Sequence, residues 1–252
     1  MDAQPLFSVR ALNKSYGSKR VLTDLEFDVH QGECFVVLGR SGSGKSVALR
    51  QLNGLERPDS GTVTFDGVEI SSLPEKDLMP VRKRVAMLFQ GAALFDSMTV
   101  FENVAFPLRE HRRLSEEEID KQVTRHLALV GLFDIEQKMP VALSGGMKKR
   151  VALARSIALD PEAVLFDEPT TGLDPRTSAT IARLIKETQA HLGVTSVIVT
   201  HDLNLARKVG DRVAYLENGT FRFIGTWNEA DRSEDPEFEK FLAGEEEVDH
   251  VE

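Results

Sequence analysis

The eight residues from Gly39 to Ser46 constrain the fold of this chain more than any other feature. They read Gly-Arg-Ser-Gly-Ser-Gly-Lys-Ser, which matches the pattern G-x-x-x-x-G-K-[ST], and they follow the apolar run Cys34–Leu38. That run predicts a central strand covered on both faces, and a helix is expected to start near Lys45. Glycines let such a loop curl until its backbone N–H groups face phosphates, and the helix N-terminus adds its positive end.

The loop predicts separate roles for its residues. We expect Lys45 to reach the β and γ phosphates of a nucleotide and the Ser46 hydroxyl to ligate Mg²⁺. The residues expected to contact the nucleotide here are Gly39, Ser41, Gly42, Gly44, Lys45 and Ser46. An accidental glycine-rich turn is the alternative, and the predicted strand and helix on either side argue against it.

A second buried strand is predicted at Ala163–Phe166, and Asp167 and Glu168 follow it directly. Such a strand would deliver Asp167 beside Mg²⁺, and Glu168, one residue further, would polarise an attacking water. Acid pairs at strand ends are also common as caps. The phosphate-binding loop favours the catalytic interpretation.

The segment Leu143–Met147 discriminates between classes of nucleotide-binding protein, because ordinary kinases and GTPases have no use for it. Small residues at the start of a helix make a second phosphate-sized nest from Ser144, Gly145 and Gly146, whose donors are the Ser144 hydroxyl and nearby N–H groups. One chain does not need two nests for one triphosphate. Two chains arranged head to tail do, so the segment predicts a homodimer in which each chain closes the other's ATP.

The order of the predicted elements indicates an α/β fold. Antiparallel strands come first and include a hairpin around Asp66 and Gly67, and strands then alternate with helices, which predicts a parallel, doubly wound sheet. A helical pattern from Met98 to Val141, with Ser115 and Glu118 as a capping box, interrupts this order. The expected strands are 7–11, 21–29, 34–38, 62–65, 68–70, 163–166, 196–199 and a final pair within 212–224; the other expected helices are 176–191, a short one from 203, and 236–242.

We therefore expect one domain over residues 6–226, with a core of about 6–90 and 160–226 and a helical subdomain of about 91–159. Residues 227–252 are expected to form a C-terminal extension, an appendage to this domain. Its end is an acidic tail of the kind that is usually solvated. The acidic residues that crowd the last eight positions are Glu245, Glu246, Glu247, Asp249 and Glu252.

Composition and charge exclude several classes of protein. The 252 residues are 41% hydrophobic and 28% charged, which argues against a disordered or fibrous chain. A net charge of −9 argues against a general grip on nucleic acid. Residues 1–10 lack the pattern of a signal peptide, and no stretch approaches the roughly 18 apolar residues of a spanning helix. Cys34 is expected to be a reduced thiol in the core. We expect a cytoplasmic protein that reaches a membrane through a partner.

Over roughly residues 6 to 225 the chain resembles the ABC ATPases, with all of the family's motifs present in family order. The resemblance implies a P-loop NTPase core of the RecA-like type, a parallel sheet with an antiparallel β subdomain and an inserted α-helical subdomain. It implies Mg²⁺-dependent hydrolysis of ATP coupled to transport. It also implies a homodimer in the ATP-bound state and a peripheral position at the inner face of the plasma membrane.

The resemblance implies roles for four further residues. Tyr16 matches the aromatic residue that stacks on adenine, and Gln90 matches the glutamine that senses Mg²⁺ and the attacking water. Asp174, in Gly172-Leu173-Asp174, matches the loop that couples the two sites, and His201 matches the histidine that contacts the γ-phosphate. Taken singly, Tyr16 could be a surface aromatic, Gln90 a polar group at a strand end, and His201 a structural histidine.

The segments Gln90–Val100 and Asn103–Leu108, together with Met147, resemble the ATPases of the Mla and MCE-linked transporters, which move phospholipids between bacterial membranes. In that family the region forms a groove that grips a cytoplasmic helix of the permease, so we expect a permease at Gly91–Pro107 and an MCE-domain protein as a further partner. About half of the apolar side chains in this region are expected to be subdomain core. An importer of amino acids or other small polar solutes is the alternative.

Two other classes fit less well. A soluble ABC ATPase acting on DNA or ribosomes generally carries a long coiled-coil insertion or two fused cassettes, whereas this insertion is short and the charge is negative. A small-molecule kinase would leave Leu143–Met147 without a role. These motifs do not encode the transported substrate, the direction of transport, the identity of the permease or the resting oligomeric state.

Overall fold

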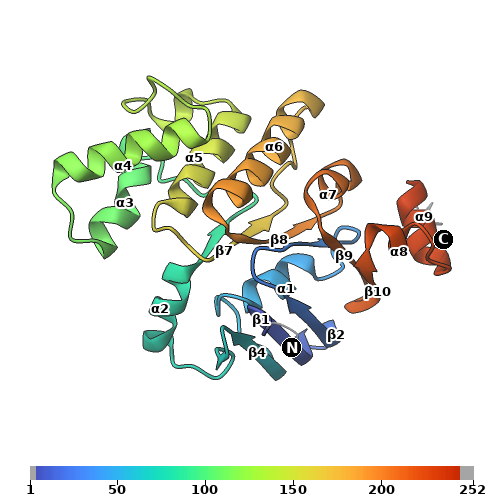
Figure 1. Cartoon of the computed structure of the whole chain (residues 1–252). Coiled ribbons are helices and arrows are strands. Elements are labelled where there is room, and N and C mark those ends of the chain that lie inside the picture. Colours follow the sequence, from blue (N-terminus) through green and yellow to red (C-terminus); the bar gives the residue numbers. More distant parts are fainter. Residues whose placement is uncertain (1–3, 245–252) are drawn as a thin grey trace.

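The computed structural model describes residues 4–244 of the chain. A six-stranded sheet in the order β10-β9-β3-β8-β7-β6 forms its centre (Figure 1). Its strands are β3 (Cys34–Leu38), β6 (Val85–Leu88), β7 (Ala163–Asp167), β8 (Thr195–Thr200), β9 (Arg212–Glu217) and β10 (Thr220–Thr226). The first five of these pair in parallel, and β10 runs antiparallel to β9. The predicted parallel core is confirmed.

A second sheet contains four antiparallel strands in the order β2-β1-β4-β5, and Figure 1 draws it below the first. Its strands are β1 (Phe7–Tyr16), β2 (Lys19–Val29), β4 (Ser60–Phe65) and β5 (Val68–Glu69). Asp66 and Gly67 have φ angles of 49° and 76°, and positive φ at both central residues is what a tight hairpin turn requires. Helix α1 (Lys45–Gln51) packs against β7, β8 and β2, so it lies between the two sheets.

The alternation of side chains along the central strands builds two cores. In β3, Val36 and Leu38 join a cluster with α5 (Gly145–Ile157), α6 (Pro175–Leu192) and α7 (Leu203–Val209). Phe35 and Val37 join a second cluster with α1 and the antiparallel sheet. Successive side chains of a strand point to opposite faces, so a strand covered on both sides must be apolar throughout.

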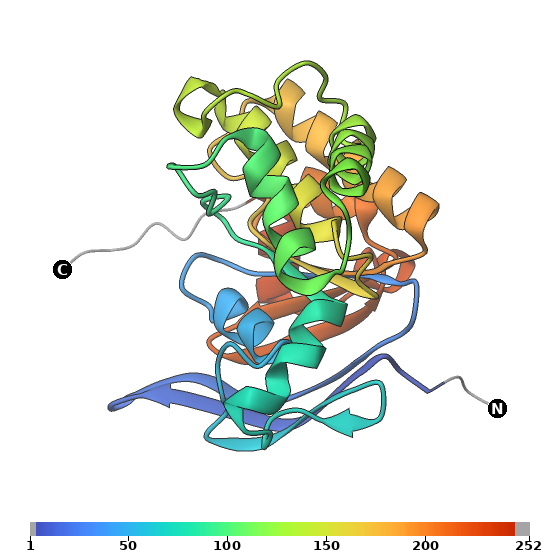
Figure 2. The same cartoon turned by 90° about the vertical axis from the view of Figure 1, so that its left-hand side faces the viewer.

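The predicted helical subdomain lies on the far side of the six-stranded sheet from the antiparallel strands (Figures 1 and 2). Helices α3 (Val100–His111), α4 (Glu116–Leu129) and α5 pack on one another, and the short 3-10 helix η1 (Pro140–Ala142) precedes α5. The predicted capping box is present at α4, because Ser115 Oγ accepts from the Glu118 N–H and the Glu118 carboxylate accepts from the Ser115 N–H. The domain limits given above stay a prediction.

Helix α2 (Glu75–Arg84) was absent from the expected elements, as were strand β6 and the short helix at 227–230. Pro80 lies inside α2. Proline removes a backbone donor and usually ends a helix, so the local sequence argues against this element. Acidic residues in its first turn and basic residues in its last turn favour it through the helix dipole.

The C-terminal residues up to 244 pack against the core, so the expectation of an appendage is wrong for this part. Helices α8 (Trp227–Ala230) and α9 (Pro236–Ala243) cover the β9–β10 edge of the sheet. The Phe238 ring is fully buried, and its centroid lies 5.0 Å from that of the Tyr215 ring and 4.9 Å from that of the Phe223 ring. The helix expected at 236–242 is therefore present as part of the core packing. The crowded acidic residues of the tail lie outside the described residues.

Cys34 is fully buried in β3 and free, and burial raises the pKa of its thiol. This agrees with a reduced core thiol. No helix within residues 4–244 is both long and apolar enough to cross a bilayer.

Candidate active site

The loop Gly39–Ser46 joins β3 to α1, as predicted, and two of its glycines are required by its shape. Gly44 has a φ of 104°, which residues with a Cβ atom rarely adopt. At Gly39 a Cβ atom would lie 2.4 Å from the carbonyl oxygen of Leu216. Only glycine lets the loop lie this close to β9.

Lys45 opens α1 with its ammonium group turned back into the loop. Its side chain is only 6% exposed, and Nζ donates to the carbonyl oxygens of Gly39 and Arg40 at 2.8 Å each. Burial lowers the pKa of Lys45, and the nearby Glu168 carboxylate opposes that shift. A partly desolvated cation of this kind favours an anionic ligand beside the loop.

Ser46 and Asp167 meet where α1 faces the end of β7. Ser46 Oγ donates to Asp167 Oδ1 at 2.6 Å. Among residues 4–244 no cluster of three or more His, Cys, Asp or Glu could hold a metal ion by itself. Mg²⁺ is usually bound through one or two carboxylates together with substrate phosphates, so this hydroxyl–carboxylate pair beside the loop fits Mg²⁺ bound with a nucleotide.

Glu168 has a left-handed backbone, with φ of 48°, and a buried carboxylate with several partners. Lys45 Nζ lies 3.5 Å from Oε1, and His201 Nδ1 lies 3.0 Å from Oε2. The hydroxyl groups of Thr171 and Thr200 donate to Oε2 at 3.0 and 3.2 Å. Strained backbone of this kind persists only where surrounding contacts hold it, and it is enriched at active sites.

One cavity of about 880 Å³ collects most of the predicted nucleotide residues, and this size is within the range of small-molecule sites. The predicted residues that line it are Tyr16, Ser41, Gly42, Gly44, Lys45, Ser46, Gln90, Glu168 and His201. Tyr16 is about half exposed at the end of β1, and Gln90 is exposed just beyond β6. Both are accessible to a ligand, as their predicted roles require.

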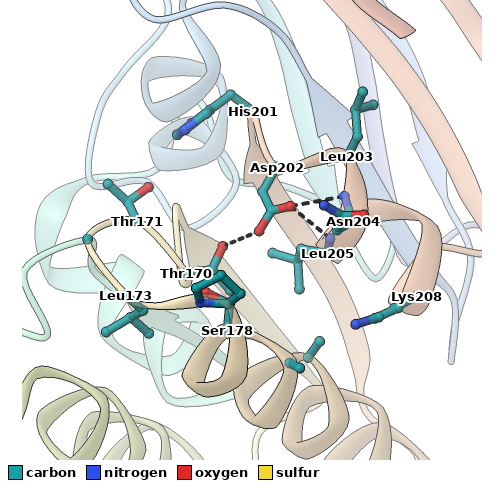
Figure 3. Close-up of a pocket in the computed structure, with 14 residues that line it drawn as sticks. Thr170, Thr171, Leu173, Ser178, His201, Asp202, Leu203, Asn204, Leu205 and Lys208 are labelled. Atoms are coloured by element: carbon teal, nitrogen blue, oxygen red, sulfur yellow. Dashed lines mark hydrogen bonds between the residues drawn. The ribbon is translucent and has the colours of Figure 1, made fainter. Parts of the chain in front are cut away.

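A second cavity of about 600 Å³ shares Thr171, His201 and Leu203 with the first. Figure 3 shows that its walls come from the loop after β7, the start of α6, and α7. Thr170 Oγ1 donates to one carboxylate oxygen of Asp202 at 2.9 Å, and the other oxygen accepts from two N–H groups of α7 (Figure 3). Asp202 therefore ties the loop that follows Glu168 to the loop that carries His201.

Six predicted residues do not line the nucleotide cavity in the described part of the chain. Two of them contact residues that do, because Gly39 bonds Lys45 and Asp167 bonds Ser46. The other four are Ser144, Gly145, Gly146 and Asp174. Ser144 caps α5, where its Oγ accepts from the Met147 N–H at 3.3 Å. Asp174 caps α6 by accepting from the N–H groups of Arg176 and Thr177.

The starts of α5 and α6 are in contact at Gly146. A Cβ atom there would lie 2.4 Å from the Thr177 methyl group, so glycine is needed for the close approach. The exposed Ser144 and Gly145 are therefore held next to the start of α6, outside the nucleotide cavity.

Two residues that the sequence did not single out also belong to this site. Phe241 of α9 lines the nucleotide cavity, and its spacing of three from the buried Phe238 is a signal that could have found it. Lys149 of α5 donates to the main-chain oxygen of Glu168 at 3.0 Å. Nothing in the local sequence separates Lys149 from its neighbour Lys148.

Comparison with known proteins places the chain in a family. A family model described as "ABC transporter" matches residues 22–171. The probable ribonucleotide transport ATP-binding protein mkl of Mycobacterium leprae is 43% identical over 236 residues, which are 94% of this chain and 68% of that protein. The methionine import ATP-binding protein MetN of Carboxydothermus hydrogenoformans is 45% identical over 214 residues, 84% of this chain and 63% of that protein. The chain thus spans about two thirds of the length of these curated relatives.

Solved structures agree with this placement. The cbiO1 protein of Clostridium perfringens, part of the ABC transporter complex cbiONQ, superposes with a TM-score of 0.83 at 31% identity, covering 95% of this chain and 96% of that one. A dimeric ATP-binding cassette in a post-hydrolysis state, bound to ADP and Pi, has a TM-score of 0.82 at 32% identity, covering 87% of this chain and 98% of that one. On its motifs, its fold and these likenesses, the chain belongs to the family of ABC transporter ATP-binding proteins.

Proposed function

We propose that this chain is the ATP-hydrolysing motor subunit of an ABC transporter and that it works at the inner face of the plasma membrane. The observation that carries the proposal is the environment of Glu168. Its buried carboxylate lies between Lys45 of the phosphate-binding loop and His201, inside a cavity of nucleotide size. A carboxylate in this position can accept a proton from a water molecule that attacks the terminal phosphate.

In the proposed reaction, Lys45 and the loop N–H groups hold the β and γ phosphates, and Tyr16 stacks on the adenine. Glu168 orients the attacking water and takes its proton, so the products are ADP and inorganic phosphate. His201 contacts the γ-phosphate, and Gln90 reaches the water from the end of β6. Mg²⁺, when bound, neutralises charge that develops on the phosphate oxygens.

We propose that two chains form the working unit. Ser144 and Gly145 at the start of α5 are exposed and do not line the cavity of their own chain, and a helix N-terminus favours phosphate. A head-to-tail pair would bring this N-terminus onto the ATP of the other chain, with Asp174 near the junction. The dimeric form of one solved relative supports this arrangement.

The proposed permease site is the groove around Gly91–Pro107. Phe95 and Phe106 are 41% and 37% exposed, their ring centroids lie 5.1 Å apart, and both line a cavity of about 370 Å³. Val100 and Val104 of the same segment are fully buried. Part of the segment is therefore core, as expected, and the two phenylalanines form an apolar surface suited to a short helix of a partner.

For the transported substrate we propose phospholipid or another lipid, moved with a permease and an MCE-domain protein. This rests on the resemblance of residues 90–108 and Met147 to the lipid-trafficking ATPases. The names of the relatives support a second candidate, an importer of small polar solutes, because they refer to ribonucleotide transport and methionine import. Co-purification of a permease and an MCE-domain protein with the tagged chain would favour lipid, and recovery with a permease and a solute-binding protein would favour the second candidate.

The proposed activity is tested by phosphate release without any acceptor. We expect the wild-type chain to release phosphate from ATP only when Mg²⁺ is present. Glu168→Gln keeps the shape but removes the base, so turnover should fall by about 100-fold or more, near 3 kcal/mol of barrier, while Mg-ATP still binds.

Glu162→Gln is the matched control for this test, because Glu162 lies just before the same strand and pairs with Arg84 on the surface. Its turnover should stay close to that of wild type. A Glu168→Gln protein that turns over within threefold of wild type would remove Glu168 from the mechanism.

A further inference from the structure

Lys149 is a buried cation that has no role in the reaction proposed above. It is the fifth residue of α5 and is only 6% exposed. Its Nζ donates to the main-chain carbonyl oxygen of Glu168 at 3.0 Å, and this bond is buried. Within residues 4–244 it forms no ion pair with a carboxylate, although the charges of Glu168 and Asp167 favour its protonated form from further away. Burial lowers the pKa of Lys149, and burying a lysine without a carboxylate in contact is costly, so its position calls for an explanation beyond packing.

The acceptor of this bond is the residue whose backbone is strained. Glu168 has a φ of 48°, a region that residues with a side chain seldom occupy unless their surroundings hold them there. Its N–H donates to the Val199 carbonyl at 3.0 Å, and its carbonyl accepts from Lys149 and from the Thr171 N–H at 3.3 Å. Both ends of its backbone are thus tied, and Lys149 is the side chain that ties the carbonyl end.

The same helix also carries the second nest. Ser144, Gly145 and Gly146 open α5, and at 1.5 Å per residue Lys149 lies only about 7.5 Å further along the axis. A helix of this length moves as one body, so a displacement of its N-terminus changes the distance from Lys149 to Glu168.

We propose that Lys149 is a positioning residue, which holds the Glu168 backbone in the left-handed conformation and makes that conformation depend on the placement of α5. This rests on the proposed function. In the dimer, α5 would contact the ATP of the other chain with its first turn and set the catalytic carboxylate of its own chain with Lys149. Seating of one nucleotide would then complete the site for the other.

The test replaces Lys149 with methionine, which keeps the length and apolar stem but removes the donor and the charge. We expect turnover of ATP at saturation to fall at least about tenfold, because a misplaced catalytic group commonly costs this much or more. Affinity for Mg-ATP should stay within about twofold, since Lys149 does not line the cavity. The melting temperature should change little, because the loss of a buried charge offsets the loss of one hydrogen bond, and the Glu168 carbonyl keeps the Thr171 N–H as a donor.

Lys148→Met is the matched control, because it removes the same charge one residue earlier on the same helix, where the side chain is more exposed. It should leave turnover near that of wild type. Lys149→Arg keeps a cationic donor and should recover turnover relative to the methionine variant. In a Glu168→Gln background, Lys149→Met should add little to the loss seen in single-turnover hydrolysis, because both changes act on one step.

The outcomes separate this proposal from the proposed function. If the wild-type chain does not hydrolyse ATP, the proposed function fails. If it does, wild-type turnover in Lys149→Met would overturn the positioning role, and so would a loss of turnover that follows a lowered melting temperature. A stable Lys149→Arg protein that is as slow as the methionine variant would also overturn it, as would additive losses in the double variant.

Discussion

Lys45 illustrates how single residues in this site depend on their surroundings. Its ammonium group is almost fully buried, and it is satisfied here by two loop carbonyls and by the Glu168 carboxylate 3.5 Å away. Phosphate oxygens carry more charge than carbonyl oxygens, so a bound triphosphate would compete well for the same donors. The same residue can therefore hold the loop in shape and bind ligand.

Replacing Lys45 with alanine should weaken nucleotide binding, because it deletes the cation that we propose faces the β and γ phosphates. Titration with a fluorescent ATP analogue would measure the loss, which we expect to be at least about tenfold, the effect of losing one charge-assisted contact. Lys121→Ala removes an exposed lysine of α4 that pairs with Glu117 and serves as the control. Unchanged affinity in Lys45→Ala would contradict the assignment.

At the scale of elements, two segments contribute a residue to the nucleotide cavity and also contact other parts of the molecule. The first is the loop between β6 and α3, where the Asn103 side chain bonds the backbone of Phe95 on both its N–H and its carbonyl. The Arg155 guanidinium lies 5.5 Å from the Phe95 ring and donates to the Ala92 carbonyl at 3.1 Å. These bonds hold the loop that follows Gln90 to α3 and α5, and we predict that pressure on the groove is passed along this loop to Gln90. The second is α9, which presents Phe241 to the cavity.

Phe95→Ala should weaken recovery of the chain with its permease while leaving the ATP affinity of the isolated subunit nearly unchanged. A docked aromatic anchor typically loses about 2 kcal/mol or more on truncation. The ring is 41% exposed, so the melting temperature should change little. Measuring melting temperature, ATP affinity and complex recovery on the same variant separates a docking role from a core role. A destabilised subunit that still assembles would defeat the coupling assignment.

The two phenylalanines of α9 should behave differently. Phe238→Ala removes a fully buried ring and should destabilise the fold by about 3–5 kcal/mol, as core phenylalanine truncations do. Phe241→Ala should mainly lower nucleotide affinity, because its ring forms part of the cavity wall and is only partly buried. Thermal unfolding and nucleotide titration on both variants give the comparison. If the Phe241→Ala protein binds nucleotide like wild type, the role of α9 is limited to supporting the sheet.

At the scale of the whole molecule, the parts that we propose for hydrolysis lie in two places on one chain. The cavity contains the phosphate-binding loop and Glu168, and the second nest lies outside it. A closed symmetric dimer would unite these two places twice, once at each nucleotide. One chain would then be enough for folding, whereas hydrolysis of ATP would need two chains.

Mixing two inactive variants tests this arrangement. Ser144→Arg blocks the nest and Lys45→Ala disables the loop, so neither homodimer should hydrolyse ATP. A mixed dimer rebuilds at most one complete site, and some phosphate release should return on mixing. The control is each variant at the same total concentration. No recovery in demonstrated mixed dimers would favour a site confined to one chain.

Local pattern was sufficient for much of the fold and site. The glycines of the loop, the apolar strands at 34–38 and 163–166 and the Ser115 capping box are short-range features, and each was found where the pattern predicted it. The cavity also brings together Tyr16, Gln90 and His201, although the roles of these residues stay predictions. Helix α2 was missed because Pro80 contradicts it locally, and the packing of α9 because its partners Tyr215 and Phe223 lie on other elements.

The sequence by itself determined which chemistry is available, because loop curvature, strand burial and helix caps depend on residues within a few positions of one another. Tertiary structure alone decided which groups act together. Lys149 and Glu168 are separated by 19 residues, and a bond between them exists only because α5 packs beside the end of β7. Phe241 reaches the nucleotide cavity because α9 folds back onto β9. Contacts of this kind arise when distant apolar faces are buried together, and no local pattern records which faces will meet.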